Sequence, residues 1–257
     1  MNNSVRWEQV PAQLFLPSNS VHVWSARLDQ PESIFEQLQS SLSKDERIHA
    51  DKFVFDRDRQ HFVVARGVLR NILGAYLDVA PGVVQFSYEP TGKPFLASSS
   101  AINPLQFNLS HAHGLAVYAF TQHTEVGIDV EYIRPIPDCD RIAAQNFSQQ
   151  ERIIFSALPI DEKIPAFFRI WTRKEAFIKA LGDGLTFPLN QFSVVPESGE
   201  TTDLVTVDDH STRVSQWLLG SFVPEPNYIA ALATQSRFAQ ISFWSWKDNS
   251  EFLGHVS

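Results

Sequence analysis

Hydrophobic and polar residues alternate along several short segments of the chain, which is the pattern of half-buried β-strands. The clearest of these segments are 21–28 (VHVWSARL) and 126–133 (VGIDVEYI). Two longer segments instead carry apolar residues at helical spacing, namely 59–77 (RQHFVVARGVLRNILGAYL) and 165–181 (PAFFRIWTRKEAFIKAL). The pattern therefore predicts an α+β protein in which long helices pack against sheets.

The predicted elements occur twice along the chain. When the sequence is shifted by 105 positions, Val21 falls on Val126 and Ser43 falls on Ser148. Further matches in the same register are Glu46 on Glu151, Arg47 on Arg152, Ile48 on Ile153 and Phe62 on Phe167. Additional strands are expected in matching pairs, near 83–88 and 190–195, and at 114–121 and 228–234. The order and the nearly constant offset of these matches indicate an internal duplication.

The duplication predicts two similar α+β halves, residues 1–124 and residues 125–257. Two such halves would pack as a pseudodimer about a pseudo-twofold axis, which creates one cleft between them. Because ligand sites favour clefts at such junctions, we expect the active site there. The halves already provide each other's partner, so we expect a monomer.

Composition and charge narrow the class of protein. The chain of 257 residues is 44% hydrophobic and has a formal net charge of −8, so it can bury a core and is a poor general binder of nucleic acid. Cys139 is the single cysteine, which excludes an intrachain disulfide and suits a reducing compartment such as the cytoplasm. No signal peptide or membrane-spanning segment is visible, so we expect no membrane partner.

Three carboxylates distinguish the second half from the first. Asp129 and Glu131 are two residues apart on a predicted strand, so both side chains leave the same face. Glu175 lies on the predicted long helix that follows. Oxygen ligands without cysteine or histidine suit Mg²⁺ better than zinc. The alternative for this set is a solvent-facing acidic strand together with an ordinary Glu–Lys pair on a helix.

The long helix of the second half places a cation beside its carboxylate. Trp171, Glu175 and Lys179 follow one another at steps of four, so they share one stripe of the helix. A carboxylate and an ammonium on one stripe can hold a metal ion and a phosphate together. The alternative is a surface salt bridge beside a buried tryptophan.

The first half contributes two polar segments. Residues 91–94 (TGKP) form a predicted turn that presents Lys93, which can equally be an ordinary exposed turn lysine. In FNLSH, at 107–111, Asn108 and Ser110 share one face of a strand and His111 takes the other. The Ser–His pair suggests a hydrolase only weakly, because adjacent residues rarely form the nucleophile–base hydrogen bond and no G-x-S-x-G surrounds the serine.

Taken together, these segments resemble the Sfp-type 4′-phosphopantetheinyl transferases. The resemblance rests on GKP at 92–94, FNLSH at 107–111, GIDVE at 127–131 and WTRKEAFIKALGDGL at 171–185, in the order and spacing of that family. FSQQE at 147–151 is a weaker match. The family resemblance implies a fold that is a pseudodimer of two α+β halves. It also implies the transfer of 4′-phosphopantetheine from coenzyme A (CoA) to a serine of an apo acyl or peptidyl carrier protein, with release of adenosine 3′,5′-bisphosphate. Single-unit relatives of the family are trimeric, and this chain is too long for that type.

The resemblance also assigns roles to individual residues. It implies that Asp129, Glu131 and Glu175 bind Mg²⁺ at the CoA pyrophosphate and that Lys179 contacts the leaving phosphate. Glu175, or a water held by Mg²⁺ near it, is the expected general base. The residues expected to hold CoA are Arg47, Gly92, Lys93, Pro94, Asn108, Ser110, His111, Lys174 and Lys179. Arg66 and Arg70 are further candidates for CoA, or they form salt bridges between the halves.

Carrier recognition and the alternatives to transfer complete the expectations. Because the chain is acidic and carriers are usually acidic too, we expect docking on a local apolar surface, around Phe155, Leu158 and Ile160 unless that segment is core. A second hypothesis is another Mg²⁺-dependent enzyme that cleaves a nucleotide pyrophosphate with water. A third is a non-catalytic carrier-binding relative, against which the intact carboxylates and Lys179 argue.

Overall fold

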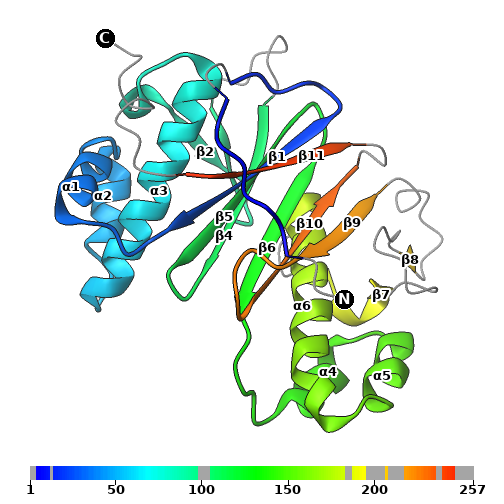
Figure 1. Cartoon of the computed structure of the whole chain (residues 1–257). Helices are drawn as coiled ribbons and strands as arrows, with labels where there is room; N and C mark the ends of the chain where they lie inside the picture. Colours follow the sequence, from blue (N-terminus) through cyan, green and yellow to red (C-terminus); the bar gives the residue numbers. More distant parts are fainter. Residues whose placement is uncertain are drawn as a thin grey trace.

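The computed structural model describes residues 4–11, 14–97, 105–182, 187–194, 206–207, 217–235 and 239–246. The chain forms two α+β units, one after the other, with a final strand that returns to the first unit (Figure 1). The elements of the first unit are β1 (Ser20–Arg27), α1 (Glu32–Ser40), α2 (Lys44–Ala50), α3 (Asp56–Leu77), β2 (Phe86–Tyr88), β3 (Pro94–Leu96), β4 (Leu105–Ala112) and β5 (Leu115–Gln122). The elements that follow are β6 (Val126–Tyr132), α4 (Cys139–Asn146), α5 (Gln149–Ser156), α6 (Ile160–Leu181), β7 (Phe192–Ser193), β8 (Thr206–Val207), β9 (Leu218–Phe222), β10 (Tyr228–Thr234) and β11 (Gln240–Ser245).

The two main sheets repeat one arrangement of strands. The first sheet has the order β11-β1-β5-β4 and the second has the order β6-β10-β9. In both, the first strand of the unit pairs antiparallel with the last, which pairs antiparallel with the strand before it. Small two-stranded sheets, β2-β3 and β7-β8, follow the long helix of each unit. The predicted mixed α+β class is confirmed.

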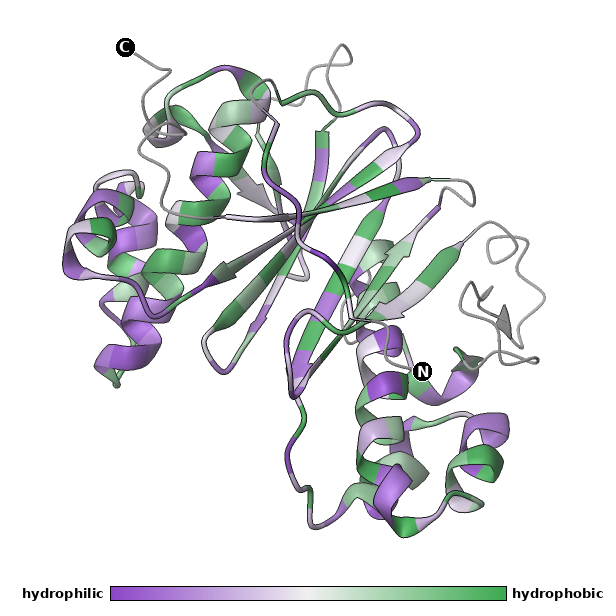
Figure 2. Cartoon of the chain, viewed as in Figure 1, coloured by the Kyte–Doolittle hydropathy of each residue, from purple (hydrophilic) through white to green (hydrophobic). Residues whose placement is uncertain are grey.

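The sheets face each other, and the helices cover their outer faces (Figure 1). Apolar residues of alternate positions on β1, β5, β6 and β10 form the core between the sheets, including Val23, Val117, Ile128 and Leu232. The opposite faces of the same strands pack against α3 in one unit and against α6 in the other. Strand side chains alternate between the two faces, so β1, β5 and β10, which have packed neighbours on both, are buried on both faces. In Figure 2 the strands are largely apolar, whereas α1 and α2 carry many polar residues.

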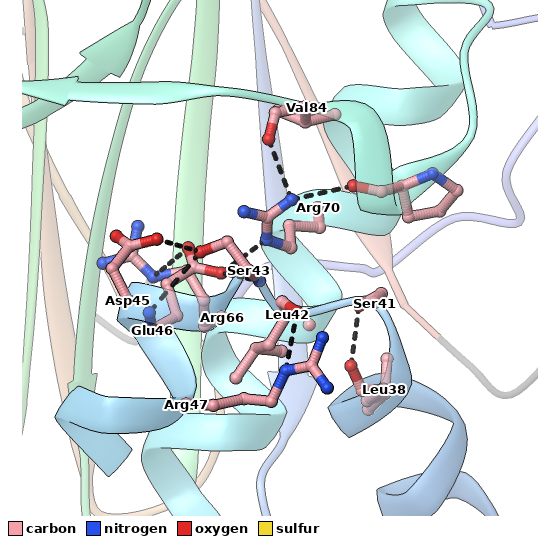
Figure 3. A network of polar contacts seen from close by, with 12 residues as sticks. Leu38, Ser41, Leu42, Ser43, Asp45, Glu46, Arg47, Arg66, Arg70 and Val84 are labelled. Atoms are coloured by element: carbon pink, nitrogen blue, oxygen red, sulfur yellow. Dashed lines mark hydrogen bonds and ion pairs between the residues drawn. The ribbon is translucent and has the colours of Figure 1, made fainter.

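Each unit has a buried ion pair between its short helix and its long helix, which we call its buried anchor: Glu46 with Arg70 in the first unit and Glu151 with Lys174 in the second. Ser43 and Glu46 form a capping box at α2, and Ser148 and Glu151 form the same box at α5. Each glutamate also meets a cation of the long helix in the interior: Arg70 Nε donates to Glu46 Oε2 at 2.7 Å (Figure 3), and Lys174 Nζ lies 2.7 Å from Glu151 Oε2. Because a buried charge needs a partner, each pair fixes its short helix against its long one.

These pairs refine the offset of the duplication. The capping boxes are 105 positions apart, whereas the long helices, Asp56–Leu77 and Ile160–Leu181, are 104 positions apart. Arg70 therefore corresponds to Lys174, whereas a constant offset of 105 positions would align it with Glu175. The second long helix begins at Ile160 rather than at 165, with Asp161 and Glu162 in its first turn, where acidic residues suit the helix dipole.

Both ends of the described chain tie the units together, which the sequence pattern does not predict. Strand β11 follows the second unit but pairs parallel with β1 of the first. Near the N-terminus, Ser4 bridges to Val223 and Glu8 bridges to Trp244. Each end of the described part of the chain thus pairs with the other unit. Among the described residues, no helix is both long enough and apolar enough to cross a membrane.

Candidate active site

The candidate site lies where two edge strands and a helix meet. Strand β4 is the edge of the first sheet, β6 is the edge of the second, and α6 covers β6. Of the predicted residues, Ser110 comes from β4, Asp129 and Glu131 come from β6, and Glu175 and Lys179 come from α6. The structure thus brings residues of both halves to one place.

Gly127 allows the helix to lie directly on the strand. A Cβ atom at this residue would meet the Ala176 carbonyl oxygen at 2.0 Å and the Ala180 nitrogen at 2.4 Å. Those atoms belong to the helix backbone and cannot move aside. Because Gly127 and Asp129 share one face of β6, the missing side chain lets α6 bring Lys179 within hydrogen-bond distance of the carboxylate.

Asp129 is the centre of the site. Its side chain is only 6% exposed, and its Oδ1 atom accepts hydrogen bonds from Lys179 Nζ at 2.6 Å and Ser110 Oγ at 2.9 Å. Lys179 Nζ also lies 3.0 Å from Ser110 Oγ, which closes a triangle of polar atoms. The second oxygen, Oδ2, is buried and has no hydrogen-bond partner among the described residues. A buried carboxylate oxygen without a partner is costly unless a further group binds it.

The other two carboxylates are held in an environment that disfavours charge. Burial, followed by the negative charge of Asp129, raises the pKa of Glu131 and that of Glu175. The positive charge of Lys179 lowers the pKa of both glutamates and so opposes this rise. Arg134 does the same at Glu131, where its Nη1 atom lies 3.6 Å from Oε2. The charge of Asp129 therefore acts on both glutamates, and a cation bound beside it would relieve this repulsion.

The chemistry of these donors fits Mg²⁺, although the side chains are not gathered into a finished metal site. Within the described part of the chain, no three Asp, Glu, His or Cys side chains stand close enough together to hold a metal ion as they are. Lys179 instead occupies one oxygen of Asp129. The partnerless Oδ2 and the two carboxylates with raised pKa values nonetheless provide hard oxygen ligands.

The FNLSH segment contacts the second unit. Besides the contact of Ser110 with Asp129, the Oδ1 atom of Asn108 accepts the backbone N–H of Ile128 at 3.0 Å. His111 follows at the exposed end of β4. The protein around its ring, and then the charge of Lys179, lower the pKa of His111, which favours the neutral imidazole.

The GKP turn reaches the C-terminal end of α6. Lys93 Nζ donates to the carbonyl of Ala180 at 3.3 Å, and Thr91 Oγ1 donates to the carbonyl of Gly182 at 2.9 Å. Gly92 adopts a positive φ of 89° with open space around it, and Pro94 begins β3. The turn thus binds the last carbonyls of the helix that carries Glu175 and Lys179, where cations and donors are favourable.

Two residues expected to hold CoA lie elsewhere. Lys174 is fully buried, where it pairs with Glu151 and donates to the carbonyls of Leu189 and Phe192. Its neighbour Glu175 projects from another side of the helix, where it senses the charge of Asp129, so Lys174 stabilises the packing of the helices instead of facing Asp129. Arg47 is exposed on α2, and its Nε donates to the Leu42 carbonyl at 3.0 Å (Figure 3).

Other candidates also receive structural roles. Arg66 and Arg70 both contact Glu46 within the first unit, so the salt bridges that they form do not join the halves. Phe155 is part of the core and Leu158 is partly buried, whereas Ile160 is 81% exposed. The contacts of Asn108 with β6 and of Thr91 with α6 were not foreseen. Their signal in the sequence is small polar residues at an edge strand and at a turn, which is common to many surfaces.

Comparisons with known proteins agree with this arrangement. A sequence profile described as the 4′-phosphopantetheinyl transferase superfamily matches residues 125–233, and one described as the 4′-phosphopantetheinyl transferase N-terminal domain matches residues 24–123. The chain is 40% identical to the 4′-phosphopantetheinyl transferase HetI of Nostoc sp., over 93% of this chain and 98% of that protein. It is 30% identical to psf-1 of Bacillus pumilus, over 78% and 82%, and 29% identical to Sfp of Bacillus subtilis, over 68% and 76%. Both bear the same transferase name.

The fold, the polar site and these similarities define the class of protein as a group-transfer enzyme. The chain belongs to the 4′-phosphopantetheinyl transferase family.

Proposed function

We propose that this site transfers 4′-phosphopantetheine from CoA to a serine hydroxyl of an apo acyl or peptidyl carrier protein. The serine oxygen forms a bond to the phosphorus next to pantetheine, and the bond from that phosphorus to the bridging oxygen breaks. Adenosine 3′,5′-bisphosphate leaves with the bond's electron pair. The observation that carries this proposal is the Asp129–Lys179–Ser110 cluster at the junction of the units, in a chain that belongs to this transferase family.

In this proposal the carboxylates bind the metal ion and Lys179 stabilises the leaving group. We assign Asp129, Glu131 and Glu175 to Mg²⁺, because one buried oxygen lacks a partner and two of the carboxyls have raised pKa values. When bound, Mg²⁺ would neutralise part of the pyrophosphate charge. Lys179 stabilises the negative charge that grows on the leaving phosphate, since its ammonium group has a third donor beyond its contacts with Asp129 and Ser110.

Glu175, or a water molecule held by Mg²⁺ near it, is the group to which we assign the proton of the carrier serine, because a carboxylate that coordinates the ion cannot serve fully as the base. A general base works best when its pKa lies nearer the operating pH than that of an ordinary carboxyl. Burial and the charge of Asp129 shift the pKa of Glu175 in that direction. Its position on α6, one turn before Lys179, places the base and the cation on one stripe of the helix.

The first unit supplies the binding surface for CoA in this proposal. Lys93 makes one long hydrogen bond, to the Ala180 carbonyl, and lies 3.6 Å from Glu125 Oε2, so its ammonium keeps a donor for a phosphate, and Gly92 leaves room for close approach. His111 is exposed at the end of β4, next to Ser110. Arg47 lies on the surface of the same unit and is retained as a candidate phosphate contact, whereas Lys174 is not.

We also propose that the two units are related by a pseudo-twofold axis and that the protein is a cytoplasmic monomer. The support for the axis is the repeated strand order, the repeated capping boxes and the equivalent buried ion pairs. A duplicated unit already buries its sheet against its twin, so no further copy is needed to form the core. The competing hypothesis of a hydrolase acting on a nucleotide pyrophosphate has no support from the comparisons.

The intact mass of an apo-carrier tests the function. The carrier is incubated with CoA, Mg²⁺ and this protein, and we expect a gain of about 340 Da, the mass of the phosphopantetheine group. Omitting Mg²⁺ or substituting the carrier serine by alanine provides the controls. Consumption of CoA at the same rate with and without a carrier would instead show hydrolysis and would contradict the proposal.

A further inference from the structure

Strands β4 and β6 run beside each other at the edges of different sheets, and side chains connect them at the site. The Asn108 side chain is 5% exposed, and its Oδ1 atom accepts the Ile128 N–H at 3.0 Å. A backbone N–H at a buried sheet edge needs an acceptor, which a neighbouring strand would ordinarily supply. Here the carboxamide of the first unit takes the place of that strand.

The next residue on the same face of β4 acts on the neighbouring residue of β6. Ser110 Oγ donates to Asp129 Oδ1 at 2.9 Å, and Asp129 directly follows Ile128 in the chain. One contact therefore fixes the backbone that leads into Asp129, and the other fixes its carboxylate. Because Ser110 and Lys179 share the Oδ1 atom, Oδ2 is the oxygen that remains for another ligand.

We propose that Asn108 and Ser110 are positioning residues for Asp129, through which the first unit sets the metal affinity of the second. The inference rests on the proposed function only in assigning Asp129 to Mg²⁺. It differs from the expected role of both residues, which was to hold CoA. Their present partners are a backbone N–H and a carboxylate of the second unit.

The physical basis is the orientation of a ligand before the metal arrives. Without Ser110 the orientation of the carboxylate is restrained by Lys179 alone, and without Asn108 the edge of β6 loses its buried acceptor. Groups that orient a metal ligand commonly change metal affinity by about 10-fold to 100-fold when they are removed. A residue that contacts only CoA would leave the affinity of the free protein for metal unchanged.

Two titrations without a carrier separate these roles. Binding of Mn²⁺, a paramagnetic substitute for Mg²⁺, is measured by electron paramagnetic resonance on the whole protein without CoA. Binding of CoA is measured by calorimetry in the presence of EDTA. We expect Ser110→Ala and Asn108→Ala each to weaken Mn²⁺ binding about tenfold, while CoA affinity in EDTA changes less than about twofold.

Gln106→Ala is the matched control. Gln106 is on the same face of β4, two residues before Asn108, and no hydrogen bond of its side chain is seen within the described residues. It should leave both affinities unchanged. Ser110→Ala removes a single atom, so it tests the proposal even if Asn108→Ala does not fold.

Two results would overturn the inference. Unchanged Mn²⁺ affinity in Ser110→Ala would show that the serine does not position the metal ligand. Failure of the wild-type protein to bind Mn²⁺ would remove the ligand that is to be positioned. Neither titration contains a carrier, so failure of transfer in the mass experiment would reject the proposed function and leave this result standing.

Discussion

The two units differ at one matching strand position, where the first unit buries an aromatic residue and the second buries a charged one. On β1, Trp24 faces α3 and is fully buried, and its Nε1 donates to the hydroxyl of Tyr76 at 3.1 Å. At the matching place on β6, Asp129 faces α6 and pairs with Lys179. The tryptophan fills its space, whereas the aspartate keeps an oxygen without a partner. One copy of the unit therefore provides packing, and the other provides chemistry.

The two units agree in the buried ion pair that joins the short helix to the long helix. Both keep a buried glutamate that caps a short helix and pairs with a cation of the long helix, Glu46 with Arg70 and Glu151 with Lys174. The difference that bears on the site lies on the face of the long helix that packs against the first strand of each unit. This contrast leads to predictions of decreasing size.

Loss of either buried anchor should cost the most. Glu151→Ala leaves the Lys174 ammonium unpaired in the interior, so we expect the free energy of unfolding to fall by about 3–5 kcal/mol. Glu46→Ala should have a similar effect through Arg70. Chemical denaturation measures both. The exposed pair of Asp138 with Arg141 is the control, and Asp138→Ala should change stability by less than about 1 kcal/mol. A comparably small effect of Glu151→Ala would contradict the role of the anchor.

Removal of the central carboxylate should abolish transfer and leave the fold intact. We expect Asp129→Ala to cost at least about 3 kcal/mol of transition-state stabilisation, which is more than about 100-fold in rate. The rate of carrier modification is compared with that of the wild-type protein, and circular dichroism checks the fold. Near-normal transfer at ordinary Mg²⁺ concentrations would show that Asp129 is not an essential metal ligand.

The two lysines of the site should affect different kinetic constants. Lys179 contacts Asp129, so Lys179→Ala should lower kcat about 100-fold, and Lys179→Arg should restore little because a planar guanidinium does not replace a compact ammonium. Lys93 lies on the turn of the first unit, so Lys93→Ala should mainly raise KM for CoA. Steady-state kinetics with varied CoA and saturating apo-carrier distinguish them. A change in KM alone for Lys179→Ala would make it a binding residue like Lys93.

Much of the frame could be predicted from the sequence, because it depends on local periodicity. The bounds predicted for the strands, 21–28 and 126–133, agree with β1 and β6 within one residue, but the structure buries both faces of these strands, whereas alternation predicts half-buried ones. The parallel return of β11 was not predicted. Its pairing with β1 joins distant segments, and no local pattern specifies which sheet a terminal strand enters.

The site could be predicted only in part, for a similar reason. Residue type and spacing brought Asp129, Glu175 and Lys179 together as a cluster, because a strand and a helix fix which side chains share a face. Lys174 is expected among the CoA contacts, yet it is buried and paired with Glu151, although it is one residue from Glu175. Its burial depends on a capping glutamate that lies 23 residues earlier in the chain, and only the packed structure shows that pairing.

Acidic pH should lower the free energy of unfolding, because His22 is buried among aromatic residues of the first unit. Burial lowers the pKa of His22 to about 4, and its Nδ1 lies 2.8 Å from the Tyr76 hydroxyl, so the folded ring stays neutral while the unfolded ring takes a proton below its ordinary pKa near 6.5. Stability is therefore lost as the pH falls, by about 2 kcal/mol between pH 7.5 and 5. His22→Gln should remove this part of the pH dependence, and the exposed His123→Asn should not. An identical pH dependence in His22→Gln would contradict the assignment.

The number of metal sites per chain tests the central claim most directly, namely that only the second unit carries the metal ligands. Mn²⁺ is titrated into the protein with saturating CoA, and bound ion is counted by electron paramagnetic resonance. The account predicts one tight site per chain, which Asp129→Ala abolishes. Two equivalent sites, or a single site that survives Asp129→Ala, would contradict it.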